Sequence, residues 1–245
     1  MTVQERGWWW RCAGAGLITM VIAFYFGEIS NIEGCAPDVS ADNLGSIIAF
    51  ELVRSPSDVA ALFGAEPCTA NFLAAMRHAT WVDALGFIPA YSAFLICGLI
   101  ALRRYGGSLS GLGIAAVAAA AIFDQIEGFW LFSIMADLPG TQGEINWLIP
   151  AVRAKFLLLG IGAIAIGVLL TRRKGLGFLF GPIIALGGLG GPALILADHY
   201  VGLTVLGSTI SWLTLFIAAL IYAMAGMKLR TLASGDEAED AATGP

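Results

Sequence analysis

Charged residues are scarce in this chain of 245 residues. They make up 13% of the composition, whereas about a quarter of the residues in an ordinary soluble domain are charged. Hydrophobic residues reach 58%, and the mean hydropathy is +0.81. This balance excludes a soluble globular fold and predicts an all-α, polytopic membrane protein.

The sequence also lacks the motifs of several chemical classes. It contains two histidines, His78 and His199, and no Cys-x-x-Cys pair, so it has neither a histidine cluster for a metal nor a haem attachment motif. It has no nucleophile elbow and no phosphate-binding loop. No basic patch is interleaved with aromatic residues, which excludes nucleic-acid binding. We therefore predict no cofactor and no metal site.

Six apolar runs are long enough to span a membrane. We predict six transmembrane helices within residues 8–27, 81–102, 112–135, 148–170, 176–197 and 203–227. Most Lys and Arg residues lie at the N-terminus or after the second, fourth and sixth runs, and these are Arg6, Arg11, Arg103, Arg104, Arg172, Arg173, Lys174, Lys228 and Arg230. The positive-inside rule then places both termini in the cytoplasm of a bacterium, with the bundle in its inner membrane.

The polar segments define the rest of the organisation. Residues 1–233 form the predicted bundle, residues 28–79 an extracytoplasmic helical loop inserted in it, and residues 234–245 a disordered acidic tail. The loop contains a predicted helix over 44–53 and a second helix that starts at the cap Ser55, with Pro56 in its first position, and stops at Gly64. This helical hairpin either covers the outer face of the bundle or lies on lipid headgroups.

Two of the four cysteines, Cys35 and Cys68, lie near the ends of the external loop. Oxidising surroundings outside the cytoplasm favour a disulfide between them. Closing a loop of about 34 residues stabilises a fold by about 3–4 kcal/mol on the chain-entropy model. The sequence therefore predicts the Cys35–Cys68 disulfide.

Acidic residues interrupt the third apolar run. Asp124 and Glu127 are three residues apart, so they share one face of a helix. Carboxylates inside a membrane almost always face a protein interior or a water-filled cavity. At about 1.5 Å per residue, Glu127 lies about 12 Å below the outer end of its run, and Lys155 lies about 10 Å below the same surface in the next run. The two side chains are therefore predicted to meet.

Other polar residues fall in the same outer half. The predicted cavity is lined by Asp83, Tyr91, Asp124, Glu127, Arg153 and Lys155, and its possible rim comprises Glu28, Glu51, Asp198 and His199. With acids in excess, the cavity takes up protons, a cation or an amine group of a ligand. In the alternative interpretation, a Glu127–Lys155 ion pair and an Asp124–Tyr91 hydrogen bond only hold the helices together.

The fifth run is rich in glycine and contains Pro182 and Pro192. Its two Gly-x-x-x-Gly spacings favour close packing against neighbouring helices. Its prolines favour a kink or a break, as in the discontinuous helices of transporters, but no second segment of this kind is present in the sequence.

Three stretches, AFEL in the loop, WVDALGFIPAY in the second run and FDQIEG in the third, together with the Lys155 region, resemble a group of small bacterial multi-pass membrane proteins of unknown function. That group has an AFELA-like loop helix, a D-x-x-F-x-x-x-Y span and a D-x-x-E-N span, usually on four helices. Here Gly128 replaces the Asn, and two further runs follow. The resemblance implies that Glu51, Asp83, Tyr91, Asp124, Glu127 and Lys155 belong together, and it implies no activity.

Three functions are consistent with this pattern. The first is a binding or accessory membrane protein whose acidic, outward-facing cavity accepts a small or lipid-like ligand or a partner complex. The second is an enzyme acting on a lipid or isoprenoid-like substrate, with Glu127 or Asp124 as general acid or base and Lys155 tuning its acidity. The third is a proton- or cation-coupled transporter. The expected partners are membrane lipids and either a larger membrane complex or further copies of the chain.

Overall fold

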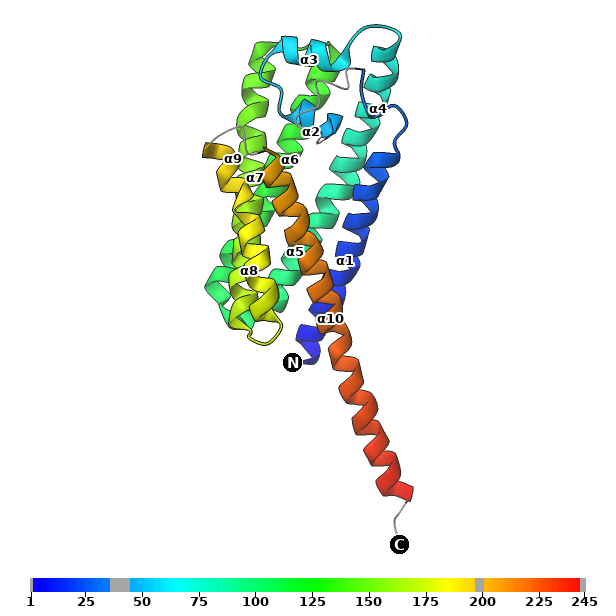
Figure 1. The fold of residues 1–245 in the computed structure, drawn as a ribbon, viewed down its shortest axis with the longest axis vertical. Helices are drawn as coiled ribbons and strands as arrows, with labels where there is room; N and C mark the ends of the chain where they lie inside the picture. The colour runs from blue at the N-terminus through cyan, green and yellow to red at the C-terminus, as the bar shows by residue number, and fades with distance from the viewer. Residues whose placement is uncertain (1, 36–44, 197–200, 243–245) are drawn as a thin grey trace.

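The computed structural model describes residues 2–35, 45–196 and 201–242, with the side chains of residues 2–35, 45–193 and 202–225. Within these residues all regular structure is helical. Figure 1 shows long helices running along one axis, with a small helical cap at the end opposite the two chain termini. The chain is an all-α helical bundle, as its composition predicts.

Five helical segments are long and apolar enough to cross a membrane. They are α1 (Val3–Glu28), the rod formed by α4 (Cys68–Val82) and α5 (Ile88–Ala101), α6 (Gly107–Ala136), α7 (Gln142–Arg172) and most of α10 (Val201–Ala242). A crossing needs about 20 apolar residues. The chain is therefore a multi-pass integral membrane protein, and five of its six predicted spans correspond to helices of this kind.

The remaining predicted span, the fifth run at residues 176–197, is not one long helix. It forms α8 (Gly177–Gly188) and α9 (Gly190–Leu196), with a break at Leu189. The break follows from Pro192, which cannot donate a hydrogen bond to the carbonyl of Gly188 and whose ring crowds that carbonyl. The glycines do allow close packing: a Cβ on Gly188 would lie 2.8 Å from the carbonyl oxygen of Gly160 on α7.

The helix of the second run begins at Cys68, so the external loop is shorter than the predicted 28–79. The apolar run starts only at Trp81 because the preceding turns are amphipathic. Their apolar face, with Phe72, Met76 and Ala79, is buried against the cap. The loop therefore ends at the start of α4, and the outer turns of this helix pack against the helices of the loop.

The cap consists of α2 (Ser46–Glu51) and α3 (Pro56–Phe63). α2 is shorter than the predicted 44–53 helix, whose first residue lies outside the described residues. The predicted start of α3 is confirmed: the Ser55 side chain accepts a hydrogen bond from the Asp58 N–H, and the Asp58 carboxylate accepts one from the Ser55 N–H. The helix ends at Gly64, which has a φ of 63°.

Apolar packing and a disulfide attach the cap to the bundle. The Phe63 ring of α3 packs edge-to-face on Phe50 of α2 and at a tilt on Phe72 of α4, with ring centroids 5.2 and 4.8 Å apart. They share a buried cluster with residues of α6 and α7. The predicted disulfide joins Cys35 to Cys68, with a Cα–Cα distance of 5.8 Å. The hairpin therefore covers the end of the bundle.

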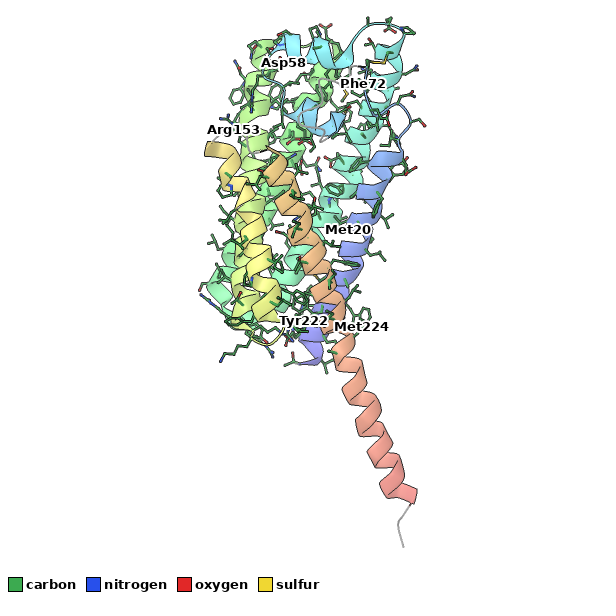
Figure 2. All side chains as sticks on the ribbon, viewed as in Figure 1. Met20, Asp58, Phe72, Arg153, Tyr222 and Met224 are labelled. Carbon is green, nitrogen blue, oxygen red and sulfur yellow. A yellow bond between two sulfur atoms is a disulfide. The ribbon has the colours of Figure 1, made fainter. Side chains whose placement is uncertain are left out.

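The opposite end of the bundle is held by a second set of charges. Glu5 of α1 forms ion pairs with Arg104, at 2.9 Å, and with Arg173. The Arg173 guanidinium also lies 3.8 Å from the ring centroid of Tyr222 on α10, a residue labelled near the start of α1 in Figure 2. We call Glu5, Arg104 and Arg173 the inner charge cluster.

The last helix is longer than a single span. α10 continues to Ala242 and extends beyond the rest of the bundle in Figure 1. It thus includes most of residues 234–245, the segment that the sequence predicts to be a disordered tail. Ala and Glu, which are common in that segment, favour helix formation.

Candidate functional site

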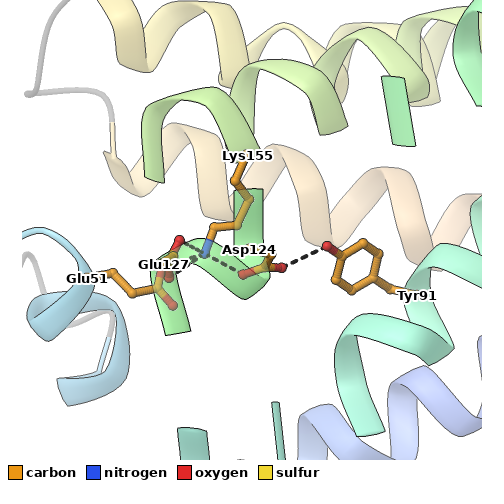
Figure 3. Close-up of polar contacts among 5 residues, drawn as sticks. All are labelled: Glu51, Tyr91, Asp124, Glu127 and Lys155. Atoms are coloured by element: carbon orange, nitrogen blue, oxygen red, sulfur yellow. Dashed lines mark hydrogen bonds and ion pairs between the residues drawn. The ribbon is translucent and has the colours of Figure 1, made fainter. Parts of the chain in front are cut away.

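Lys155 lies at the centre of a group of carboxylates (Figure 3). Its Nζ lies 2.8 and 2.7 Å from the two carboxylate oxygens of Glu127 and 3.2 Å from Oδ1 of Asp124. It also donates a hydrogen bond to Oε2 of Glu51 at 3.0 Å. We call Glu51, Asp124, Glu127 and Lys155 the outer charge cluster. It joins α7 to α6 and to the cap.

All four side chains of the outer charge cluster are buried. Their exposed fractions are 3% for Glu127, 6% for Asp124, 7% for Lys155 and 11% for Glu51. Removing an ion from water is costly, and only well-formed contacts with opposite charges offset that cost. Here one ammonium faces three carboxylates. The cluster therefore carries excess negative charge whenever all three acids are ionised.

Asp124 has a second partner. The Tyr91 hydroxyl donates a hydrogen bond to Oδ2 of Asp124 at 2.7 Å. The buried Tyr91 ring packs against Phe87 and Trp212, with centroid distances of 5.6 and 5.4 Å. The predicted Glu127–Lys155 and Asp124–Tyr91 contacts are thus both present, and both oxygens of Asp124 are engaged.

Helical spacing places the acids of α6. Asp124 and Glu127 are one turn apart and buried, whereas Gln125 and Ile126 between them are exposed. Residues three apart lie on the same helix face, which here is turned toward α7. The long Lys155 side chain reaches both acids from the neighbouring helix, as Figure 3 shows.

Glu51 is the contributor whose position in the sequence predicts a place on the possible rim, and the resemblance groups it with Lys155. It is the last residue of α2, next to the fully buried Phe50, which anchors that helix in the cap. Burial raises the pKa of the Glu51 carboxyl, the positive charge of Lys155 opposes this rise, and the charge of Asp124 adds to it. The cap therefore supplies a carboxylate to a site whose other members lie on membrane-spanning helices.

Asp83 occupies an unusual backbone position. It begins a π-helical turn, Asp83–Phe87, between α4 and α5. The Gln125 side-chain amide donates a hydrogen bond at 2.8 Å to the carbonyl of Ala84 in this turn. Single π-helical turns occur frequently at functional sites. Gln125, which lies between Asp124 and Glu127 in the third run, thus stabilises the turn that carries Asp83.

A cavity of about 880 Å³ lies beside the outer charge cluster, and Glu51 and Asp83 both line it. The remaining wall is mostly apolar and includes Phe26, Ile47, Met76, Ala79, Phe87 and Leu131. Small-molecule sites have volumes of about 300–1,000 Å³, with largely apolar walls and few polar groups. The cavity has the size and chemistry of such a site.

The cavity lies where α1 and α10 separate. The two helices touch at Trp9 and Tyr222, whose ring centroids are 5.1 Å apart, and again near Gly16. Toward the cap they diverge in Figure 1, and there Ala23 of α1 and Val205 of α10 contribute to the cavity wall. The cavity is thus confined to the half of the bundle nearer the cap.

The other predicted site residues are not part of the outer charge cluster. Arg153 is half-buried and precedes Lys155 by two residues, which turns it to a different face of α7, near α9 in Figure 2. Glu28 is exposed at the end of α1 and lines a separate hollow of about 580 Å³ near Cys68. Asp198 and His199 lie outside the described residues.

Metal binding has little support in the described part of the chain. No three His, Cys, Asp or Glu side chains are arranged there to hold a metal ion. The Lys155 amine occupies the centre of the outer charge cluster, which is the position that a cation bound to its three acids would need.

The chain matches no family model, no curated protein and no solved structure. The fold and the geometry of the outer charge cluster are therefore the basis for assigning a function.

Proposed function

We propose that this chain is a membrane binding protein that holds a small or lipid-like ligand in the acidic cavity beside the outer charge cluster. The observation that carries the proposal is that Glu51 and Asp83 both line a largely apolar cavity of about 880 Å³. A cluster that only held helices together would need no cavity beside its carboxylates. Carboxylates on a cavity wall are placed to meet a ligand instead.

The proposal includes a topology. α8 and α9 together cross the membrane as one composite span, which brings the number of crossings to six. Both termini then lie in the cytoplasm, and the cap lies outside. Support comes from Figure 1, in which both chain ends lie at the end of the bundle opposite the cap. The basic residues Arg103, Arg104, Arg172, Arg173 and Lys174 follow the inner ends of α5 and α7. A bacterial inner membrane fits this charge distribution.

A reporter fusion tests the topology. Alkaline phosphatase fused after Ala225 is expected to be inactive, because the enzyme becomes active only outside the cytoplasm. The same fusion at Gly140, between α6 and α7, is expected to be active. Phosphatase activity of the fusion after Ala225 would contradict a membrane crossing by α8 and α9.

Purification from the expressing membrane tests the ligand. The chain is extracted in mild detergent, and the small molecules that accompany it are quantified by mass spectrometry. Ala23→Trp, which places a large side chain in the cavity, is compared with Val21→Trp, at an exposed position of the same helix that does not line it. We expect a near-stoichiometric molecule with the parent chain and with Val21→Trp, and its loss with Ala23→Trp. Retention by Ala23→Trp, or no bound molecule in any sample, would contradict the proposed function.

A further inference from the structure

We propose that the ligand of this cavity is a cationic amphiphile: a single ammonium group attached to an apolar chain. The inference rests on the proposed function and names the class of ligand. In this arrangement the ammonium lies between the carboxylates of Asp83 and Glu51, and the chain lies along the apolar wall.

The balance of charge calls for a cation. The outer charge cluster has three carboxylates and one ammonium, and two further acids line the same cavity, the half-buried Asp83 and the exposed Glu33. Isolated charges in low-dielectric surroundings are strongly unfavourable, and a nearby opposite charge relieves that penalty. An anionic ligand would add to the repulsion, and a neutral ligand would leave it unchanged. A ligand with one positive charge lowers it.

The Asp83 carboxylate is the acid at the cavity that is available to bind an ammonium group. Lys155 already contacts Glu51, Asp124 and Glu127, and Tyr91 already donates to Asp124. Within the described part of the chain no hydrogen bond or ion pair reaches the Asp83 carboxylate, which is half-buried and lines the cavity. Buried carboxylates normally have partners. An ammonium in the cavity would provide one.

The apolar wall determines the other part of the ligand. Phe26, Ile47, Met76 and Leu131 line the same cavity as the acids. The Phe87 ring lies beside Asp83 on the same π-helical turn and also lines the cavity, where its face can contact a cation. A small hydrophilic amine would leave this wall without a partner. An alkyl or isoprenoid-like chain bearing an amine would cover it.

A photoreactive dodecylamine, with a diazirine in its chain, tests the inference. The full chain is reconstituted in nanodiscs of zwitterionic lipid, irradiated with the probe, and the labelled peptides are identified by mass spectrometry. We expect labelling of the cavity wall around Met76 and Leu131. Excess dodecylamine should compete for this labelling at least tenfold better than dodecanol or dodecanoic acid, which have chains of the same length.

A pair of variants tests the role of the acid. Asp83→Asn keeps the size of the side chain and removes its charge, and it should weaken dodecylamine competition about tenfold or more, because charge-assisted hydrogen bonds are the strong ones. Asp137→Asn makes the same change at an exposed position at the outer end of α6 and should leave competition unchanged. Asp83→Glu should retain most of the affinity, and thermal unfolding of each variant reports whether it is folded.

The outcomes separate the two proposals. Equal competition by dodecylamine and dodecanol, or equal loss with Asp83→Asn and Asp137→Asn, would overturn the cationic ligand and leave a binding cavity in place. No labelling of the cavity wall by the photoreactive dodecylamine would overturn the cavity as a binding site for lipid-like molecules as well.

Discussion

The two ends of the bundle hold buried charges in opposite proportions. The inner charge cluster has one acid, Glu5, between two arginines, whereas the outer charge cluster has one base, Lys155, among three acids. The arginine side chains at the inner end differ in exposure, at 45% for Arg104 and 12% for Arg173. At the outer end the exposed fraction of every member is 11% or less.

This difference explains why we assign function to one end only. Arg104 at the inner end reaches solvent and headgroups, so its excess positive charge is readily compensated by water and anions. The excess negative charge at the outer end is enclosed by protein and borders a mostly apolar cavity. Ion pairs at the inner end therefore hold the helices together with their charge compensated. At the outer end the ion pairs of Lys155 leave an excess of negative charge that is not compensated.

The largest expected effect is at Lys155. Lys155→Met removes the ammonium that contacts the three acids, and breaking a buried ion pair from one side costs about 3–5 kcal/mol. We expect a strongly lowered unfolding midpoint in detergent, or failure to accumulate as a folded monodisperse species. Lys174→Met, at an exposed position of the inner end, is the matched control and should change stability little. Equal effects at both positions would remove the distinction between the two ends.

Tyr91→Phe is expected to have the next largest effect. It keeps the ring that packs on Phe87 and Trp212 and removes the hydroxyl that donates to Asp124. Hydrogen bonds to charged groups contribute about 1.5–3 kcal/mol, and the unfolding midpoint should fall accordingly. Tyr25→Phe removes a hydroxyl that contacts His78 at an exposed site, so it should have a smaller effect. A silent Tyr91→Phe would show that Asp124 is not held by this bond.

The stability of the protein should depend on pH through Glu51. Its folded-state pKa is raised by burial, so the folded chain binds more protons than the unfolded chain at pH values above the ordinary value of this carboxyl. Stability therefore falls as pH rises from that ordinary value through the raised one. Glu51→Gln should make this fall less steep, because Gln does not titrate.

Unfolding midpoints measured from pH 4 to 8 test the sign of the Glu51 effect. The slope should be reduced rather than abolished in Glu51→Gln, because other carboxylates share the site. Glu66→Gln, a change of the same type at an exposed position of the external loop that does not line the cavity, should keep the parental slope. A Glu51→Gln profile that falls as steeply as the parental one would contradict the raised pKa of Glu51.

The smallest expected effect is at Arg104. Arg104→Gln breaks one ion pair of Glu5 but leaves Arg173 in place. Partly exposed pairs contribute about 0–1 kcal/mol and are weakened by salt. The unfolding midpoint should fall slightly at low ionic strength and match that of the parent at high salt. A loss as large as that of Lys155→Met would mean that the inner charge cluster is as enclosed as the outer one.

Periodicity and depth predict much of this arrangement. The 1.5 Å rise of a helix is sufficient to bring Glu127 and Lys155 to one level, and the three-residue spacing is sufficient to turn Asp124 the same way. The cysteine pair follows from its place in an external loop. These features depend on helix geometry and on depth below the membrane surface, and both can be read from the residue spacing and the ends of the apolar runs.

Three features could not be predicted in the same way. The approach of Glu51 to Lys155 depends on how the cap folds back over α6 and α7, which no period in the loop encodes. The π-helical turn at Asp83 depends on a side-chain hydrogen bond from Gln125 on another helix. The break between α8 and α9 is indicated by Pro192, but a proline kink and a complete break look alike in the sequence.

The accessibility of the cavity from outside tests the central claim most directly. In a chain with Cys12→Ala and Cys97→Ala, Thr80→Cys places a thiol on the cavity wall beside Asp83. We predict that a membrane-impermeant maleimide labels Thr80→Cys in intact cells, and that Ser108→Cys, at the start of α6, is labelled only after the membrane is opened. Labelling of Thr80→Cys only from the opened side would contradict an acidic cavity that faces outward.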